Sequence, residues 1–180
     1  MKKLTILLAI PLLLTIVFGT VYATTQQMSR QSANDPQIQL AEDAAARLDQ
    51  GADPTSVIGG GNVDIAKSLA PFVIVYDTSG HVVAGTGYLD GNIPAVPSGV
   101  LTSAQGKPYN AVTWQPQTGV RIASVTVHAK NYSVLSGRSL TEVEKRDNTI
   151  LLLVTCGWLA SLVGFAIAGG IVLRRPAKRA

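Results

Sequence analysis

The sequence contains little of the chemistry from which most catalytic and metal sites are built. It has one cysteine and two histidines among 180 residues. Because Cys156 is alone, an intramolecular disulfide is excluded, and only a disulfide between two copies remains open. His81 and His128 lie far apart in the chain, without the close spacing typical of a metal site. We therefore expect no metal ion, no cofactor and no catalytic residues.

Charged side chains are missing from two long segments, Leu4–Ala23 and Ile150–Leu173. As α-helices they would be about 30 Å and about 36 Å long, enough to cross a hydrocarbon core of roughly 30 Å. A charge at mid-membrane would cost about 2.5–3.5 kcal/mol, and neither segment has one. We expect residues 1–23 and 149–173 to be transmembrane helices. A signal peptide cleaved after Val21-Tyr22-Ala23 is the alternative for the first segment.

Basic residues gather at the outer flanks of the two apolar segments, where no acidic residue accompanies them. The segment between the flanks holds the other nine Lys and Arg and all eleven Asp and Glu, a net charge of −2 (9 − 11). Cytoplasmic flanks are the positive ones. We therefore expect a two-pass cell-membrane protein with both termini cytoplasmic, an extracytoplasmic domain at 24–148 and a basic tail at 174–180. The basic flanking residues are Lys2, Lys3, Arg174, Arg175, Lys178 and Arg179.

The distribution of charge also bears on partners. A nucleic-acid surface needs basic residues on the folded domain, and here the excess of positive charge lies at the membrane flanks. We therefore expect the membrane as a partner and no nucleic acid.

The central segment has the pattern of one α+β domain. A helix is expected to begin at Asn34-Asp35-Pro36 and to end before Gly51, and Asn62 is expected to cap a short helix over Val63–Leu69. Alternation and turn residues then indicate about five antiparallel strands with helices packed on the sheet. The expected strands are 72–76, 81–84, 109–115, 120–127 and 133–137, with a turn at 116–119, a short helix at 98–105 and a last helix from Leu140.

The hairpin segment Val75-Tyr76-Asp77-Thr78-Ser79-Gly80-His81-Val82-Val83-Ala84 resembles the first hairpin of the PAS-like, or Cache, extracytoplasmic sensor domains of bacterial sensor kinases. The order of the expected elements is also similar to that of those domains. The resemblance covers roughly residues 34–173 and implies a PAS-like sheet with a ligand between one sheet face and the connecting loop. Further segments carry it: Thr113-Trp114-Gln115-Pro116, Gly119-Val120-Arg121-Ile122-Ala123, and Gly137-Arg138-Ser139-Leu140 followed by Glu142-Val143-Glu144.

The chain departs from that family after its second apolar segment. The kinases continue into a HAMP linker, a helix with a phospho-accepting histidine and an ATP-binding domain, whereas seven residues follow Leu173 here. We therefore expect a membrane-anchored, sensor-like ligand-binding protein without its own output domain, which takes part in signal transduction through a partner. The alternative is a structural or assembly protein of the envelope that binds another protein and no small molecule. A third class, an extracytoplasmic enzyme, would need a serine or carboxylate hydrogen-bonded to a histidine in a cleft.

Six residues on the expected strands and loop are candidates for binding a small-molecule ligand. Arg121 can pair with a carboxylate through two parallel hydrogen bonds. Trp114 can stack on an apolar or cationic ligand. In the competing interpretation the aromatic residues fill the core, and Arg121 is exposed or pairs with a carboxylate of the domain. The six candidates are Tyr76, Tyr88, Tyr109, Trp114, Arg121 and His128.

Small residues recur along the second apolar segment at steps of three and four. Such a face lets helices approach closely in a membrane. It suggests a homodimer or a membrane-protein partner held through this helix. The residues are Gly157, Ala160, Ser161, Gly164 and Ala168.

Overall fold

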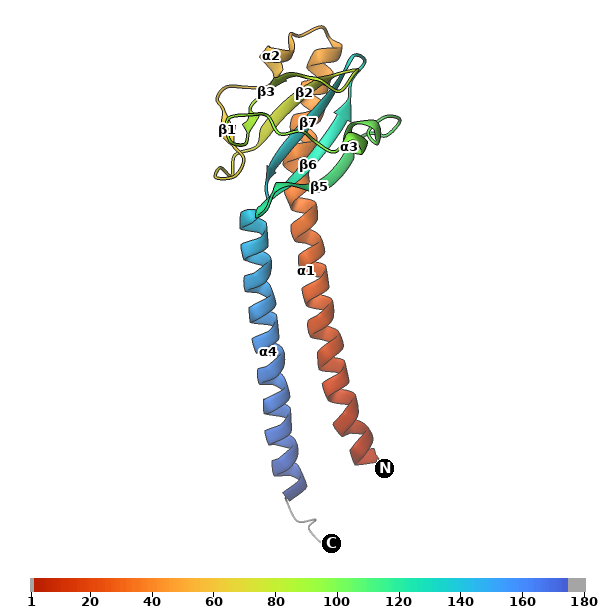
Figure 1. The fold of residues 1–180 in the computed structure, drawn as a ribbon. Helices are drawn as coiled ribbons and strands as arrows, with labels where there is room; N and C mark the ends of the chain where they lie inside the picture. Colours follow the sequence, from red (N-terminus) through yellow and green to blue (C-terminus); the bar gives the residue numbers. More distant parts are fainter. Residues whose placement is uncertain (1, 175–180) are drawn as a thin grey trace. The chain divides into compact units, whose positions relative to one another are not determined.

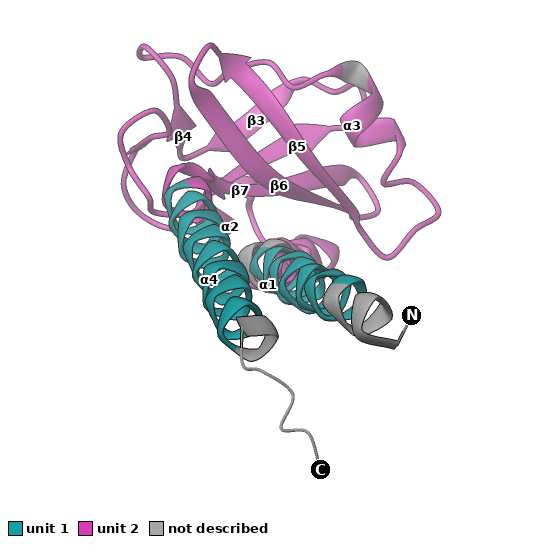
Figure 2. Cartoon of the chain, turned by 90° about the horizontal axis from the view of Figure 1, so that it is seen from below, with its two compact units in different colours: residues 1–29, 145–180 teal, residues 30–144 magenta. Residues whose placement is uncertain are grey.

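The computed structural model describes residues 2–174, except for the side chains of residues 2–7, 30, 32, 33, 98 and 172–174. The expected tail after residue 174 lies outside these residues. The chain divides into two compact units, residues 1–29 with 145–180 and residues 30–144 (Figure 2). The elements (Figure 1) are α1 (Lys2–Asp49), α2 (Pro54–Val57), β1 (Val63–Asp64), β2 (Phe72–Asp77), β3 (Val82–Gly85), β4 (Gly87–Tyr88), α3 (Ser98–Thr102), β5 (Asn110–Gln117), β6 (Val120–His128), β7 (Tyr132–Ser139) and α4 (Thr141–Arg174).

Unit 30–144 contains the antiparallel sheet that the alternating pattern predicts. Its five strands are ordered β3-β2-β7-β6-β5, so the last strand lies at the centre, between the first hairpin and the second. The α+β class and the five-stranded antiparallel sheet are thereby confirmed. Strands β1 and β4 form a second, two-stranded parallel sheet that the sequence did not indicate.

Both faces of the five-stranded sheet are covered, which explains why β2 is apolar at successive positions. Val73 and Val75 belong to a core with the C-terminal part of α1, where small alanines let the helix approach the strands. Phe72, Ile74 and Tyr76 belong to a second core on the opposite face, with Val100 of α3. Successive strand side chains point to opposite faces, so β2 contributes to both cores.

Two of the expected helices differ in the structure. Helix α1 runs through Pro36 instead of beginning there, although an interior proline removes one main-chain hydrogen bond of the helix. Val63–Leu69 is not a helix: Val63 N–H bonds to Thr86 O at 2.7 Å, and the Asp64 carboxylate accepts Ala66 N–H at 3.0 Å. The side chain of Asp64 thus makes a turn where a helix was expected.

The expected turn at 116–119 is also shorter in the structure. Pro116 and Gln117 belong to β5, and the pairing with β6 shifts between Trp114 and Gln117. Proline is tolerated at such an irregularity and at a sheet edge, and β5 is an edge strand. The chain reverses at Thr118 and Gly119.

The other unit consists of helical segments that pack on each other. Trp158 Nε1 donates to Thr15 Oγ1 at 3.1 Å, and Arg146 Nη2 donates to Ser29 Oγ at 3.2 Å. Helices α1 and α4 are both long and apolar enough to cross a membrane, and none of the apolar window of either is buried. A core helix of a soluble domain would be mostly buried.

Candidate binding cleft

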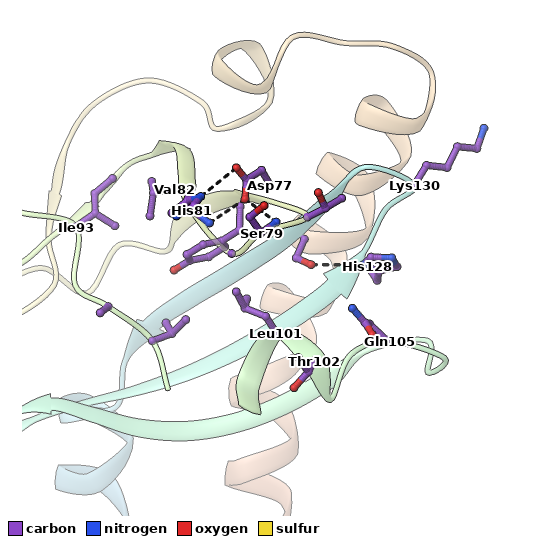
Figure 3. A pocket seen from close by; sticks show the side chains of 16 residues that line it. Asp77, Ser79, His81, Val82, Ile93, Leu101, Thr102, Gln105, His128 and Lys130 are labelled. Atoms are coloured by element: carbon purple, nitrogen blue, oxygen red, sulfur yellow. Dashed lines mark hydrogen bonds and ion pairs between the residues drawn. The ribbon is translucent and has the colours of Figure 1, made fainter. Parts of the chain in front are cut away.

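A cleft of about 750 Å³ lies on the sheet face opposite α1 (Figure 3). Strands β2, β6 and β7 supply its floor through Tyr76, His128 and Ser133. The turn between β2 and β3 forms one side, and the segment from Ile93 to Gln105, which includes α3, forms the other. Clefts of this size are typical of small-molecule sites.

The floor carries a row of polar side chains on three neighbouring strands. Tyr76 is directly opposite Ser133, and Ser133 is directly opposite His128. Residues opposite each other in antiparallel strands share a face and lie about 4.5–5.5 Å apart at Cβ. His128 Nδ1 and Ser133 Oγ are 3.4 Å apart, so the two groups share a hydrogen bond.

The Tyr76 hydroxyl is the least satisfied group of this row. Tyr76 is only 2% exposed, and its hydroxyl has no hydrogen-bond partner in the described part of the chain. Burial raises the pKa of the Tyr76 phenol, because the charged form is disfavoured away from water. The hydroxyl therefore keeps its proton and offers a hydrogen-bond donor.

The turn beside the row uses the carboxylate of Asp77. Asp77 Oδ1 accepts the N–H groups of Ser79 at 2.9 Å and His81 at 2.8 Å, and Oδ2 lies 3.5 Å from His81 Nδ1. These bonds, above all the one from the His81 main chain, lower the pKa of the Asp77 carboxyl. Asp77 has the turn role expected from its place in the hairpin, because its Oδ1 accepts two main-chain N–H groups of that turn.

Apolar side chains face the polar row from the other side. Ile93, Val96 and Leu101 line the cleft from the segment that crosses this sheet face. Lys130 is at the rim, where Figure 3 shows its side chain extended away from the cavity. No ion pair of the Lys130 ammonium is found within residues 2–174.

The six candidate residues do not form one group. Tyr76 and His128 come together in the cleft, and Trp114 belongs to the same buried core as Tyr76 without lining the cavity. Tyr88 lines a separate cavity with Asp64 and other polar residues, and Tyr109 is exposed.

Arg121 lies away from the cleft, on the other face of β6. Its Nη1 is 2.6 Å from Glu144 Oε1, and both side chains are about half exposed, at 52% and 43%. The Arg121 guanidinium, which was predicted to bind a ligand carboxylate, is therefore paired with a carboxylate of the domain itself.

Sequence reasoning did not bring the two histidines together. His81 and His128 line the same cleft from a turn and a strand end. Their proximity depends on the pairing of β7 with both β2 and β6, which no local pattern reveals. Within the described residues, no group of three His, Cys, Asp or Glu is placed to hold a metal ion.

The small residues of α4 divide between two environments. A Cβ on Gly157 would lie 3.1 Å from the ring of Phe18, so Gly157 faces α1. A Cβ on Gly164 would meet nothing within 4 Å, and Ala160 and Ala168 are exposed. Part of the small-residue face therefore packs within the chain, and Gly164, Ala160 and Ala168 lie on exposed parts of the helix.

No family model, curated protein or solved structure matches this chain. The fold and the cleft thus define its class by geometry alone: an α+β domain with a cleft on one sheet face, joined to two helices of membrane-spanning length.

Proposed function

We propose that this chain is a membrane-anchored, extracytoplasmic binding protein whose cleft takes a small molecule. The observation that carries the proposal is Tyr76, a residue that lines the cleft and whose buried hydroxyl has no partner in the described chain. A buried polar group without a partner costs about 1–3 kcal/mol. A ligand that accepts a hydrogen bond from Tyr76 would recover this energy.

The wider arrangement supports a sensor-like role. The helix, hairpin, crossing segment and three further strands in one antiparallel sheet are the elements that the PAS-like resemblance requires. The basic flanks favour an extracytoplasmic domain with both termini inside.

Strand β6 offers a route for a signal. It carries His128 at the cleft, and at its other end Arg121 O accepts Leu140 N–H at 2.9 Å. Arg121 also pairs with Glu144 in the first turn of α4. We propose that ligand binding shifts β6 against the start of α4 and that a partner protein reads the change through this helix.

The test is a screen of metabolites against the full chain in nanodiscs, with thermal unfolding as the readout. Because a ligand stabilises only the folded state, one present at about 100 times its Kd adds about 2.7 kcal/mol. Leu101→Trp should fill the cleft, so that the ligand no longer raises the unfolding temperature. Val83→Trp adds the same ring on an exposed residue outside the cleft and should keep the ligand's effect.

Absence of any stabilising compound would contradict the proposal and favour the envelope-assembly alternative. If a compound raises the unfolding temperature of Leu101→Trp as much as that of the wild type, the binding site lies outside the cleft.

A hydrolase is the second candidate, since Ser133 Oγ lies 3.4 Å from His128 Nδ1 in the cleft. No carboxylate contact to His128 occurs within the described residues, so the orienting third group of a triad is not seen there. Turnover of p-nitrophenyl esters that disappears in Ser133→Ala would establish this activity. Equal rates in both proteins would exclude Ser133 as a nucleophile.

A further inference from the structure

Resting on the proposed function, we propose that the cleft binds small carboxylic acids that have a hydrocarbon portion. The carboxylate lies on the row of Tyr76, Ser133 and His128, and the hydrocarbon portion lies against the apolar side of the cleft. Neither part of this assignment follows from the sequence, because the row is formed by strands distant in the chain.

The head group follows from the balance of donors and acceptors. Tyr76 supplies a buried O–H with no partner in the described chain, and Ser133 and His128 supply further groups able to donate. The carboxylate that lines the cleft, Asp77, already accepts three contacts within its own turn. The row itself contains no charged acceptor for an ammonium head, whereas a carboxylate can accept from Tyr76 and from the donor that the hydrogen-bonded Ser133–His128 pair leaves over.

The charges near the cleft agree with this head group. Lys130 is a cation at the rim, and its side chain extends away from the cavity. Asp77 is the opposing charge, and His81 lies against it at 3.5 Å. The lining therefore carries no excess negative charge that would repel an anion.

The hydrocarbon portion follows from the opposite side. Ile93, Val96 and Leu101 are partly buried members of the core cluster that contains Tyr76, and they also line the cleft. Covering their exposed parts removes apolar surface from water, at about 25 cal/mol per Å². A ligand with an acceptor at one end and hydrocarbon at the other matches both sides.

The test compares three water-soluble compounds that share one hydrocarbon chain: butanoate, 1-butanol and butylammonium. Each is added at the same concentration to the full chain in nanodiscs, and thermal unfolding is recorded. Only butanoate should raise the unfolding temperature. Tyr76→Phe should weaken butanoate binding about tenfold or more, because a hydrogen bond to a charged group is lost. Tyr88→Phe makes the same change in the separate cavity and should leave butanoate binding unchanged.

The outcomes separate this inference from the proposed function. Equal stabilisation by 1-butanol or butylammonium, or an undiminished effect of butanoate in Tyr76→Phe, would overturn the assignment of a carboxylate. If butanoate has no effect while a compound of another class stabilises the wild type but not Leu101→Trp, the inference falls and the binding function stands. If neither butanoate nor any compound of the screen binds, both fall.

Discussion

Tyr76 is the residue at which the packing of the core and the proposed binding function make different demands. Tyr76 belongs to a buried core and lines the cleft, and its buried hydroxyl has no partner in the described chain. A residue selected only for packing would be satisfied by a phenylalanine. The hydroxyl therefore points to a demand other than folding.

Replacing Tyr76 by Phe should leave the unliganded protein as stable as the wild type or more stable, by up to about 1 kcal/mol. The reason is that the substitution keeps the ring and removes a buried hydroxyl that is not hydrogen-bonded. Denaturant unfolding of both proteins without ligand measures the difference. A loss of more than about 2 kcal/mol would show that the hydroxyl has a structural partner and would remove the main support for the cleft.

Asp77 predicts a dependence of stability on pH. Its pKa is lowered in the folded state, so its contribution is complete above the unfolded pKa of about 4 and is lost as pH falls through the lower folded value. Asp77→Asn should therefore be less stable than wild type at pH 7 and approach it in acid. Chemical unfolding at several pH values tests this. A difference that stays constant with pH would exclude the carboxylate charge as the cause.

At the scale of elements, the ring of Phe72 in β2 packs closely over two glycines of neighbouring segments. A Cβ added at Gly137 of β7 would lie within contact of three ring atoms of Phe72, and Gly87 of β4 faces the same ring. Glycine is needed at both positions because the ring occupies the space of a side chain.

Gly137→Ala should accordingly destabilise the domain by about 1–3 kcal/mol through overpacking. Gly99→Ala is the matched control, since a Cβ there would meet nothing within 4 Å. Unfolding in denaturant compares the two variants with the wild type. Equal stability of Gly137→Ala and Gly99→Ala would mean that the ring of Phe72 moves aside freely.

The elements that could be predicted from the sequence are those with a strong local pattern. The hairpin around Asp77 and Gly80 and the strands β5 to β7 follow from alternation and turn residues. The strand at Val63 does not, since its partner Gly87 is distant in the chain, and the helix through Pro36 does not because Asn-Asp-Pro is typical of a helix start.

The candidate site was predictable only in part, for the same physical reason. Tyr76 and His128 were identified as polar groups on strands, but their adjacency requires β7 to pair with β2 and β6 together. The opposing side, with Leu101, is formed by a crossing segment without a periodic pattern. Trp114 and Arg121 were predicted as ligand-binding residues from the chemistry of their side chains. In the structure Trp114 is buried in the core, and Arg121 forms an ion pair with Glu144.

At the scale of the whole molecule, the chain combines a cleft-bearing domain with two helices of membrane-spanning length. The basic flanks predict the orientation of these helices, and in the proposed function that orientation sets the compartment that the cleft faces. The single cysteine, Cys156, simplifies the corresponding experiment, because its replacement by serine leaves a chain without thiols.

The most direct test of the central claim, a cleft outside the cytoplasm on a membrane-anchored chain, is labelling of Ser79→Cys in a Cys156→Ser background. Ser79 is exposed at the edge of the cleft. An impermeant maleimide added to intact cells should label this cysteine, while Ala177→Cys, in the expected cytoplasmic tail, should react only after the membrane is opened. Labelling of Ala177→Cys but not Ser79→Cys in intact cells would place the cleft in the cytoplasm and contradict the account.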